Sequence, residues 1–263
     1  MYNFLCVGGD KYGCSSFAAG SNGKIVNVEE ALNNINIPLC WAGSHKETLH
    51  QHCLENNRKF YNLDTGYFGN IKRKEIIRVS VNNLQDQGPI ESRPSDRLDK
   101  FKINFLNYQR GSSIVIVPPD EKISKVFKLK DSWVNDTIHE LKKYTDRPIK
   151  IRSRPLARRD RIESDTFDKF IEQDTFVVVG YSSNALVESI FCGIPVISLG
   201  HSAANSLMNY SLKDIEKISN IDNQLRYSWA CHLSYKQFTH EELLNGTAWN
   251  LLTSESSSIR SGT

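Results

Sequence analysis

The sequence predicts an α/β protein with two halves. Apolar strand-like segments alternate with helix-like segments along the chain, which is typical of parallel strands covered by helices on both faces. The segment 176–200 contains a complete strand–helix–strand unit. Residues 86–96 contain two prolines and a glycine, which break regular structure. We therefore expect a first half over residues 1–100 and a second half over residues 101–253.

The first half contains short apolar segments that are typical of strands. The expected strands are residues 4–7, 38–41, 59–63 and 76–81. Ser44 can cap a helix over residues 46–57, and Glu47 in its first turn suits the positive end of that helix. This half is at the small end of the range of domain sizes.

The second half alternates more regularly between the two kinds of segment. Its expected strands are residues 114–117, 149–151, 176–179 and 196–199, and its expected helices begin after Asp131, at Asp165 and at the capping box 239–242. The tail 254–263 is rich in serine, and we expect it to be disordered. The carboxyl ends of parallel strands meet at one edge of a sheet, so the loops after these four strands should lie together.

The segment 176–200 shows why that edge suits a ligand. Its first residues are apolar without alternation, as in a strand buried on both faces. Gly180 frees the backbone for a turn, and Ser182 or Ser183 can cap the following helix. Gly193 ends that helix before the next strand. The free N–H groups at the start of the helix suit an anion such as a diphosphate.

The same segment resembles a known family. The sequence from Ser182 to Gly200 is similar to the nucleotide-sugar-binding half of GT-B glycosyltransferases, above all the small versions in bacteriophages and the capsule-sugar transferases. Further stretches strengthen the resemblance to phage enzymes, namely residues 61–69, 77–85, 116–122, 143–149 and 237–249. The resemblance implies a GT-B-like fold with two Rossmann-like halves, each with a parallel sheet, and a cleft between them. It also implies that the second half binds a nucleotide-sugar, while the first half holds the acceptor and supplies a general base.

Candidates for binding the donor phosphates come from the loops after the strands of the second half. Ser182, Ser183 and Asn184 can bind phosphate oxygens at the helix start. Arg152 or Arg154 can add a charge-assisted clamp. The simpler interpretation is that the serines only cap the helix.

Two further donor-binding candidates follow from the resemblance. Glu188, one turn into the helix, could accept hydrogen bonds from ribose hydroxyls, or it could simply face solvent. After the double proline that ends at Pro119, the family often has serine or threonine, whereas this chain has Asp120. Lys122 could compensate for that departure.

Two basic clusters suggest a polyanionic partner on the acceptor side. The run 152–161 includes Arg158 and Arg159, and the first half contains Lys72 and Arg73. Together they could border one groove for the backbone of double-stranded DNA. The run could equally hold the donor phosphates or be a solvated loop, which is the usual role of a charged run.

A transferase needs a general base that deprotonates the acceptor hydroxyl. Asp64 is the first candidate, because it stands at a strand end beside a flexible turn. His45 is the second, at the expected start of a helix. The alternatives are that Asp64 only initiates a turn and that His45 is a surface residue of a first helical turn.

Absent motifs disfavour other enzyme classes. The sequence has no D-x-D, no G-x-x-x-x-G-K-S/T, no G-x-G-x-x-G and no G-x-S-x-G. GT-A transferases, kinases, dehydrogenases of the common type and α/β-hydrolases are therefore disfavoured. We expect no metal site and no bound cofactor, with a UDP-linked nucleotide-sugar as co-substrate and its leaving charge met by a helix dipole and arginine.

The composition is that of an ordinary globular protein. The net charge of +3 permits an acidic partner without requiring one. No apolar run reaches the length of a membrane span, and the start lacks the basic residues of a signal peptide. The six cysteines are scattered without a zinc spacing, which indicates free thiols in a reducing compartment. We therefore expect a cytoplasmic protein, in the host cytoplasm if phage-encoded, without membrane attachment; the oligomeric state stays open.

Together these observations predict a metal-independent glycosyltransferase that moves a sugar from a nucleotide-sugar to a hydroxyl acceptor. The phage-type resemblance favours a hydroxymethylated pyrimidine in phage DNA, reached in the major groove or by base flipping. One alternative is transfer to a glycan or a protein, as in capsule synthesis. Another is a non-catalytic phage protein that binds the nucleotide. The sugar, the nucleotide and the stereochemistry of transfer stay open.

Overall fold

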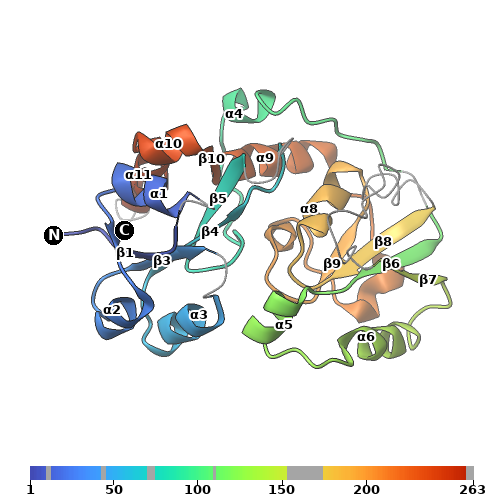
Figure 1. The fold of residues 1–263 in the computed structure, drawn as a ribbon. Helices are drawn as coiled ribbons and strands as arrows, with labels where there is room; N and C mark the ends of the chain where they lie inside the picture. Colours follow the sequence, from blue (N-terminus) through green and yellow to red (C-terminus); the bar gives the residue numbers. More distant parts are fainter. Residues whose placement is uncertain (10–12, 43–45, 70–74, 109–110, 153–173, 259–263) are drawn as a thin grey trace. The chain divides into compact units, whose positions relative to one another are not determined.

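A computed structural model describes residues 1–9, 13–42, 46–69, 75–108, 111–152 and 174–258. The chain forms two compact units, which are coloured along the sequence in Figure 1. Unit 1 comprises Met1–Asp86, Arg93–Phe101 and Cys231–Thr263, and unit 2 comprises Gln87–Ser92 and Lys102–Ala230. The C-terminal segment therefore belongs with unit 1, whereas the sequence had placed residues 231–253 in the second half.

Unit 1 is built on a six-stranded sheet with the order β10-β5-β4-β3-β1-β2. The strands are β1 (Leu5–Val7), β2 (Lys24–Ile25), β3 (Leu39–Ala42), β4 (Phe60–Thr65), β5 (Ile76–Val81) and β10 (Gln237–Thr239). Strands β1 to β4 are parallel, whereas β5 is antiparallel to β4 and β10 is antiparallel to β5. The connection from β4 to β5 is too short for the helical crossover that a parallel pair requires, so the chain turns back.

Seven helices with described positions belong wholly or partly to unit 1. They are α1 (Cys14–Gly20), α2 (Val28–Asn33), α3 (Lys46–Glu55), α4 (Asp96–Asp99), the end of α9 (Asn223–Ser234), α10 (His240–Leu244) and α11 (Thr247–Ser258). The core joins distant parts of the chain, because the rings of Phe4, Phe17 and Trp249 lie against Tyr61 on β4. Helix α11 includes residues 254–258, which the sequence had assigned to a disordered tail.

Unit 2 is built on a four-stranded sheet that is parallel throughout, in the order β7-β6-β8-β9. The strands are β6 (Ser113–Val117), β7 (Ile149–Ile151), β8 (Thr175–Gly180) and β9 (Val196–Ser198). Strands β6 and β8 are almost completely buried, as their unbroken apolar sequences predict. From β6 the chain goes to β7 on one side and then to β8 on the other, so the loops after β6 and β8 flank the switch point of the sheet.

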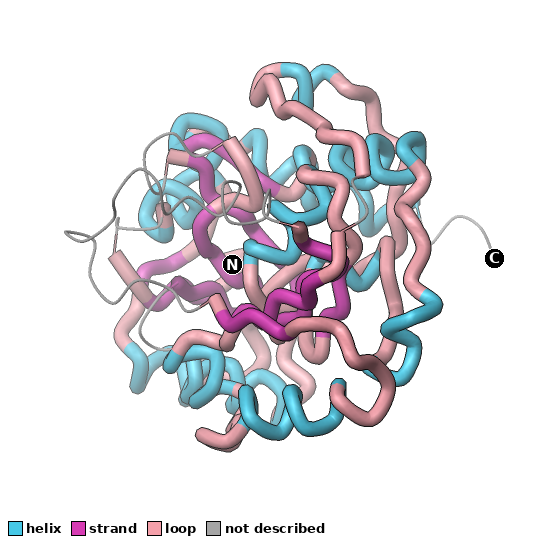
Figure 2. Tube along the Cα trace, turned by 90° about the vertical axis from the view of Figure 1, so that its right-hand side faces the viewer, coloured by secondary structure: helices cyan, strands magenta, loops and turns pink. Residues whose placement is uncertain are grey.

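Helices cover both faces of the unit 2 sheet (Figures 1 and 2). They are α5 (Glu121–Val126), α6 (Trp133–Leu141) and α8 (Asn184–Phe191), with short 3-10 helices η4 (Ala203–Ser206) and η5 (Leu212–Lys217). Figure 1 shows α8 above the strands and α6 below them. The helix expected from Asp165 lies outside the described residues. Within the described part of the chain, no helix is long and apolar enough to cross a membrane.

Helix α8 begins and ends at the residues that the sequence indicates. Ser183 is its N-cap, and the Ser183 hydroxyl accepts a hydrogen bond from the N–H of Ala185 at 3.2 Å. At its end, Gly193 has a φ of +75°, and a Cβ there would lie 2.7 Å from the carbonyl oxygen of Leu106. Glycine is therefore required both by the left-handed backbone and by the close approach.

Candidate functional site

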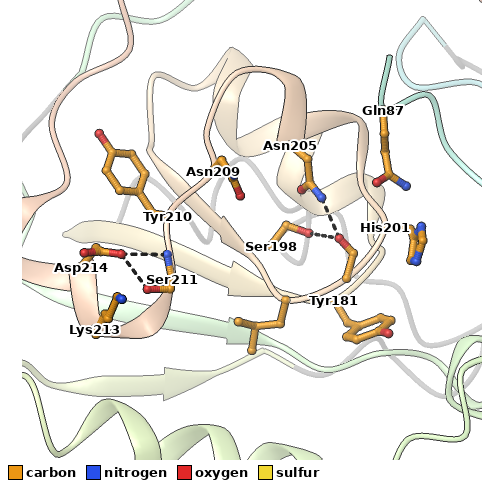
Figure 3. A pocket seen from close by; sticks show the side chains of 12 residues that line it. Gln87, Tyr181, Ser198, His201, Asn205, Asn209, Tyr210, Ser211, Lys213 and Asp214 are labelled. Atoms are coloured by element: carbon orange, nitrogen blue, oxygen red, sulfur yellow. Dashed lines mark hydrogen bonds between the residues drawn. The ribbon is translucent and has the colours of Figure 1, made fainter. Parts of the chain in front are cut away.

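A cavity of about 650 Å³ lies at the carboxyl edge of the unit 2 sheet (Figure 3). Its walls come from the loops after β8 and β9, from η4 and η5, and from the segment that enters unit 2. The lining residues are Gln87, Tyr181, Ser198, Leu199, Gly200, His201, Asn205, Asn209, Tyr210, Ser211, Lys213 and Asp214. Parallel α/β sheets bind ligands at this edge, and the volume is in the range of small-molecule sites. We refer to this cavity as the edge pocket.

Hydrogen bonds hold the loops after β8 and β9 together. The Ser182 hydroxyl donates to the carbonyl oxygen of His201. In Figure 3, Ser198 and Asn205 both point to Gly200, whose carbonyl oxygen accepts from the Ser198 hydroxyl at 3.0 Å and from the Asn205 amide at 2.9 Å. These bonds shape the pocket wall in advance of any ligand, which reduces the ordering cost of binding.

Aromatic side chains form one side of the edge pocket. The ring of His201 stacks on Phe127 with centroids 5.0 Å apart, and Tyr181 lies 5.3 Å from the same phenylalanine. Any Cβ on Gly200 would collide with the Tyr181 ring, so this glycine makes room for the aromatic wall. Partial burial raises the pKa of Tyr181 and lowers the pKa of His201. Both side chains are therefore neutral at pH 7 and suited to stack on a planar group.

The edge pocket also contains polar atoms with unused hydrogen-bonding capacity. Among the described residues, the Gln87 side-chain N–H₂ and the Asn205 side-chain oxygen are buried without a hydrogen-bond partner. Asp214 is already occupied, because it accepts from the backbone and the hydroxyl of Ser211, and these hydrogen bonds lower its pKa. Lys213 supplies a cation on the wall. The wall therefore combines side-chain amides with a positive charge.

The predicted phosphate-binding residues with described positions follow strands at this edge, but none of them is among the residues that line the edge pocket. Ser182, Ser183 and Asn184 form the turn into α8, where Ser183 serves as the cap. Arg152 follows β7, is partly exposed, and its backbone N–H donates to the carbonyl oxygen of Ile116 at 2.9 Å. Arg154 lies outside the described residues.

The loop after β6 has a structural task. Asp120 caps α5 by accepting from the N–H of Ile123 at 2.8 Å. Pro119 precedes it, and Lys122 is exposed on the first turn of α5. Glu188 is exposed on α8, so its side chain is accessible from solvent.

The first candidate base, Asp64, is part of an ion pair in unit 1. Asp64 on β4 and Arg78 on β5 are direct cross-strand partners, with 3.1 Å between a carboxylate oxygen and a guanidinium nitrogen. Arg78 also donates to the carbonyl oxygen of Thr65 and lies over the ring of Tyr67. Arg78 is nearly inaccessible, whereas the carboxylate retains 27% of its accessible surface. The ion pair therefore holds the Asp64 carboxylate in one orientation, and its side chain remains partly accessible from solvent.

Several predicted residues fall outside the described part of the chain. They are the second candidate base, His45, and the basic residues Lys72, Arg73, Arg158 and Arg159. In the described ranges, no group of three or more histidine, cysteine, aspartate or glutamate side chains is arranged to hold a metal ion.

The sequence predicted the loops of the edge pocket but not its outer wall, which Asn209, Tyr210 and Lys213 form. The loop at Gly200 and His201 follows a recognisable strand, so its place at the edge could be foreseen. Asn209, Tyr210 and Lys213 lie in and beside short 3-10 structure without a local motif. The one available signal was the Ser211 capping box at the start of η5.

Comparison with known proteins supports the fold. No protein-family model matches the sequence, and no curated protein matches it at a significant level. Among solved structures, the chain is similar to the beta Kdo 2,7 transferase of KpsC from Thermosulfurimonas dismutans, with a TM-score of 0.52 and 12% identity over 96% of this chain and 99% of that chain. The beta Kdo 2,4 transferase of the same KpsC gives a TM-score of 0.47 and 13% identity over 88% and 90%. The chain therefore has an α/β, GT-B-like fold built on two sheet-based units.

Proposed function

We propose that this protein is a glycosyltransferase that takes its sugar from a nucleotide-sugar bound in the edge pocket. The observation that carries the proposal is the pocket itself. It lies at the carboxyl edge of a parallel sheet, beside the start of α8 and next to the switch point, in a fold similar to that of a sugar transferase. Such a position suits a nucleotide diphosphate.

Each part of a nucleotide-sugar has a suitable counterpart. Tyr181 and His201 offer uncharged aromatic faces to the base. The N–H groups at the start of α8 and the side-chain amide of Asn184 suit phosphate oxygens, whereas the Ser182 hydroxyl already donates to His201. Lys213 can add a positive charge, and Arg152, which follows β7 farther along the same edge, is a second candidate. As the bond to the sugar breaks, these groups would stabilise the charge that develops on the departing phosphate.

The acceptor side is assigned to unit 1. Asp64 is the proposed general base, because its carboxylate is held in one orientation by Arg78 and stays partly exposed. It would take the proton from the acceptor hydroxyl as the oxygen attacks the sugar.

Two acceptors remain in competition. The resemblance to phage enzymes favours a hydroxymethylated pyrimidine in double-stranded DNA, which is the acceptor expected from the sequence. The likeness to KpsC favours a saccharide. The basic residues that motivated DNA lie outside the described residues, so the geometry adds no support to the DNA alternative.

One experiment tests donor and acceptor together. The protein is incubated with a panel of nucleotide-sugars and three acceptors: duplex DNA containing 5-hydroxymethylcytosine, duplex DNA containing 5-hydroxymethyluracil, and a mixture of acidic and neutral oligosaccharides. Mass spectrometry of nucleosides and oligosaccharides identifies the acceptor by its added sugar mass. Binding of free nucleotides is measured in parallel. Nucleotide binding without any product would favour the non-catalytic alternative, and neither binding nor product would refute the proposal.

A further inference from the structure

Unit 2 has a second hollow that the proposed donor site does not use. It has a volume of about 470 Å³ and lies between the end of α5, the start of α6 and Leu212 of η5. We refer to it as the α5–α6 hollow. It adjoins the edge pocket: Leu212 is followed by Lys213 of that pocket, and Trp133 makes an edge contact with Tyr181, with centroids 6.3 Å apart.

The floor of the α5–α6 hollow is apolar. It consists of Trp133, Leu129 and Leu212, all of which are partly exposed. Trp133 packs on one side against the buried core of unit 2, which fixes the indole in place. A rigid, half-exposed tryptophan offers a flat apolar surface at little entropic cost.

The charges around this floor are unbalanced. Lys128 and Lys130 both line the hollow, and among the described residues neither ammonium has a carboxylate within 4.0 Å. The two acids of the hollow are already engaged. Asp136 accepts from the Ser132 hydroxyl at 2.8 Å, and Glu140 accepts from Lys143 and Tyr144. The hydrogen bond leaves the charge of Asp136 in place, whereas Lys143 balances Glu140, so this group of side chains keeps one net positive charge.

The backbone adds an independent observation. Lys128 has a φ of +51° at the position after the C-cap of α5. Its N–H donates to the carbonyl oxygen of Lys125 at 3.2 Å, and the N–H of Leu129 donates to that of Ser124 at 2.9 Å. Glycine is the residue that this helix ending normally selects, and a lysine there costs about 1 kcal/mol. These two hydrogen bonds hold Lys128 on a fixed turn at the hollow.

We propose that the α5–α6 hollow binds an acidic saccharide unit. One face of a pyranose ring would lie on Trp133, while Lys128 and Lys130 would pair with its carboxylate or phosphate group. This inference rests on the proposed function and deepens it, because an acidic sugar bound beside the donor pocket would belong to an acceptor or product chain. Duplex DNA is less suitable, since it has no free ring face to stack and needs a longer row of cations.

The lysines provide the test, because both are exposed and can be replaced without disturbing the core. Binding of an oligogalacturonate, which is acidic, and of a maltooligosaccharide, which is neutral, is measured by calorimetry on the full chain and on the double variant Lys128→Gln/Lys130→Gln. The matched control is Lys142→Gln/Lys217→Gln, which removes the same charge at exposed sites of unit 2. We expect the acidic sugar to bind more tightly than the neutral one, and the first variant to lose about tenfold or more in affinity while the control does not.

Three results would overturn the inference. They are equal binding of the acidic and the neutral sugar, equal losses in the two double variants, and binding of a short DNA duplex in place of the sugar. Nucleotide binding measured on the same samples separates this inference from the proposed function. If the lysine variant keeps nucleotide binding and acidic sugar never binds, only the α5–α6 hollow has been misassigned.

Discussion

The polar cluster around Arg97 in unit 1 and the edge pocket of unit 2 differ in how their polar groups are paired. In unit 1, polar side chains near β5 and β10 are paired with one another: Arg97, which is almost inaccessible, binds Glu242 through two hydrogen bonds and two backbone carbonyl oxygens as well. In unit 2, the edge pocket has a donor on Gln87 and an acceptor on Asn205 that no described residue satisfies. Paired polar groups hold a scaffold together, whereas unpaired ones at a cavity prepare a surface for a ligand.

The largest expected effect concerns the one polar group of unit 1 that we assign to chemistry. Asp64→Asn should lower turnover by about 10²- to 10⁴-fold, because the amide cannot accept the proton of the acceptor. Nucleotide binding should be unchanged, since the pocket is in unit 2. Thermal unfolding of the same variant monitors the lost pairing with Arg78. If the turnover of the Asp64→Asn variant stayed within a few-fold of that of the original protein, Asp64 would not be the general base and would serve only the structure.

The next effect concerns stability rather than activity. Arg97→Ala should destabilise the protein by about 3–5 kcal/mol, because it leaves the partly buried Glu242 carboxylate without its partner. Urea unfolding measures this loss. The control is Lys24→Ala, which breaks the exposed pair with Glu30 and should change stability little. Equal effects of the two substitutions would contradict the contrast between a buried and an exposed pair.

A substitution in the edge pocket should change nucleotide binding rather than stability. Tyr181→Ala should weaken nucleotide binding by about tenfold, in line with roughly 1–3 kcal/mol for an aromatic–base stack. Tyr181→Phe keeps the ring and should bind nearly as well, which makes it the matched control. Calorimetry with free nucleotides gives both affinities. If phenylalanine were as damaging as alanine, stacking would not be the source of affinity.

The ion pair between Arg97 and Glu242 also predicts that the stability of the protein depends on pH. Burial alone would raise the pKa of Glu242, but the hydrogen bonds from Arg97 and Thr239 outweigh it, and the pKa lies below its ordinary value of 4.5. A lowered pKa in the folded state contributes stability at neutral pH, and this contribution is lost as the pH falls below 4.5. Glu242→Gln should therefore flatten the acid side of the stability curve measured by urea unfolding between pH 3 and 7. An unchanged slope would show that other carboxylates cause the acid sensitivity.

The smallest expected effect is a gain in stability rather than a loss. Lys128→Gly should stabilise the protein by about 0.5–1 kcal/mol, because glycine adopts the left-handed backbone without strain. The same change should weaken binding of an acidic saccharide. The free energy of unfolding and the sugar affinity are measured on one sample. A variant that gained stability with full sugar binding would show that this lysine is only a strained cap.

The sequence was most informative where structure depends on neighbours along the chain. Gly180, Ser183 and Gly193 specify the α8 unit locally, so its position and its edge could be predicted. Pairing between distant segments could not, because the register of Phe238 on β10 with Ile77 on β5 leaves no local mark. For the same reason the sequence misplaced residues 231–253. The pairing of Asp64 with Arg78 was in principle accessible, since both stand on strands joined by a short connection.

The residues of the outer wall of the edge pocket could not be predicted from the sequence for a different reason. Tyr210 and Lys213 are ordinary residues in 3-10 structure, and only the path of the chain after β9 brings them to the cavity. Their role depends on three-dimensional position and on no residue pattern.

The assignment of the C-terminal segment to unit 1 has a consequence for synthesis of the chain. The core of unit 1 contains Phe238, Leu243 and Leu252, and β5, which pairs with β4 on one side, acquires its second neighbour only when β10 has been made. Unit 2 ends at Ala230, so all of its strands leave the ribosome earlier. The residues after Ala230 thus complete a unit whose other strands precede unit 2 in the chain, and those strands keep an open edge while unit 2 folds. Fragments that stop near residue 230 should therefore yield a folded unit 2 attached to an aggregation-prone unit 1.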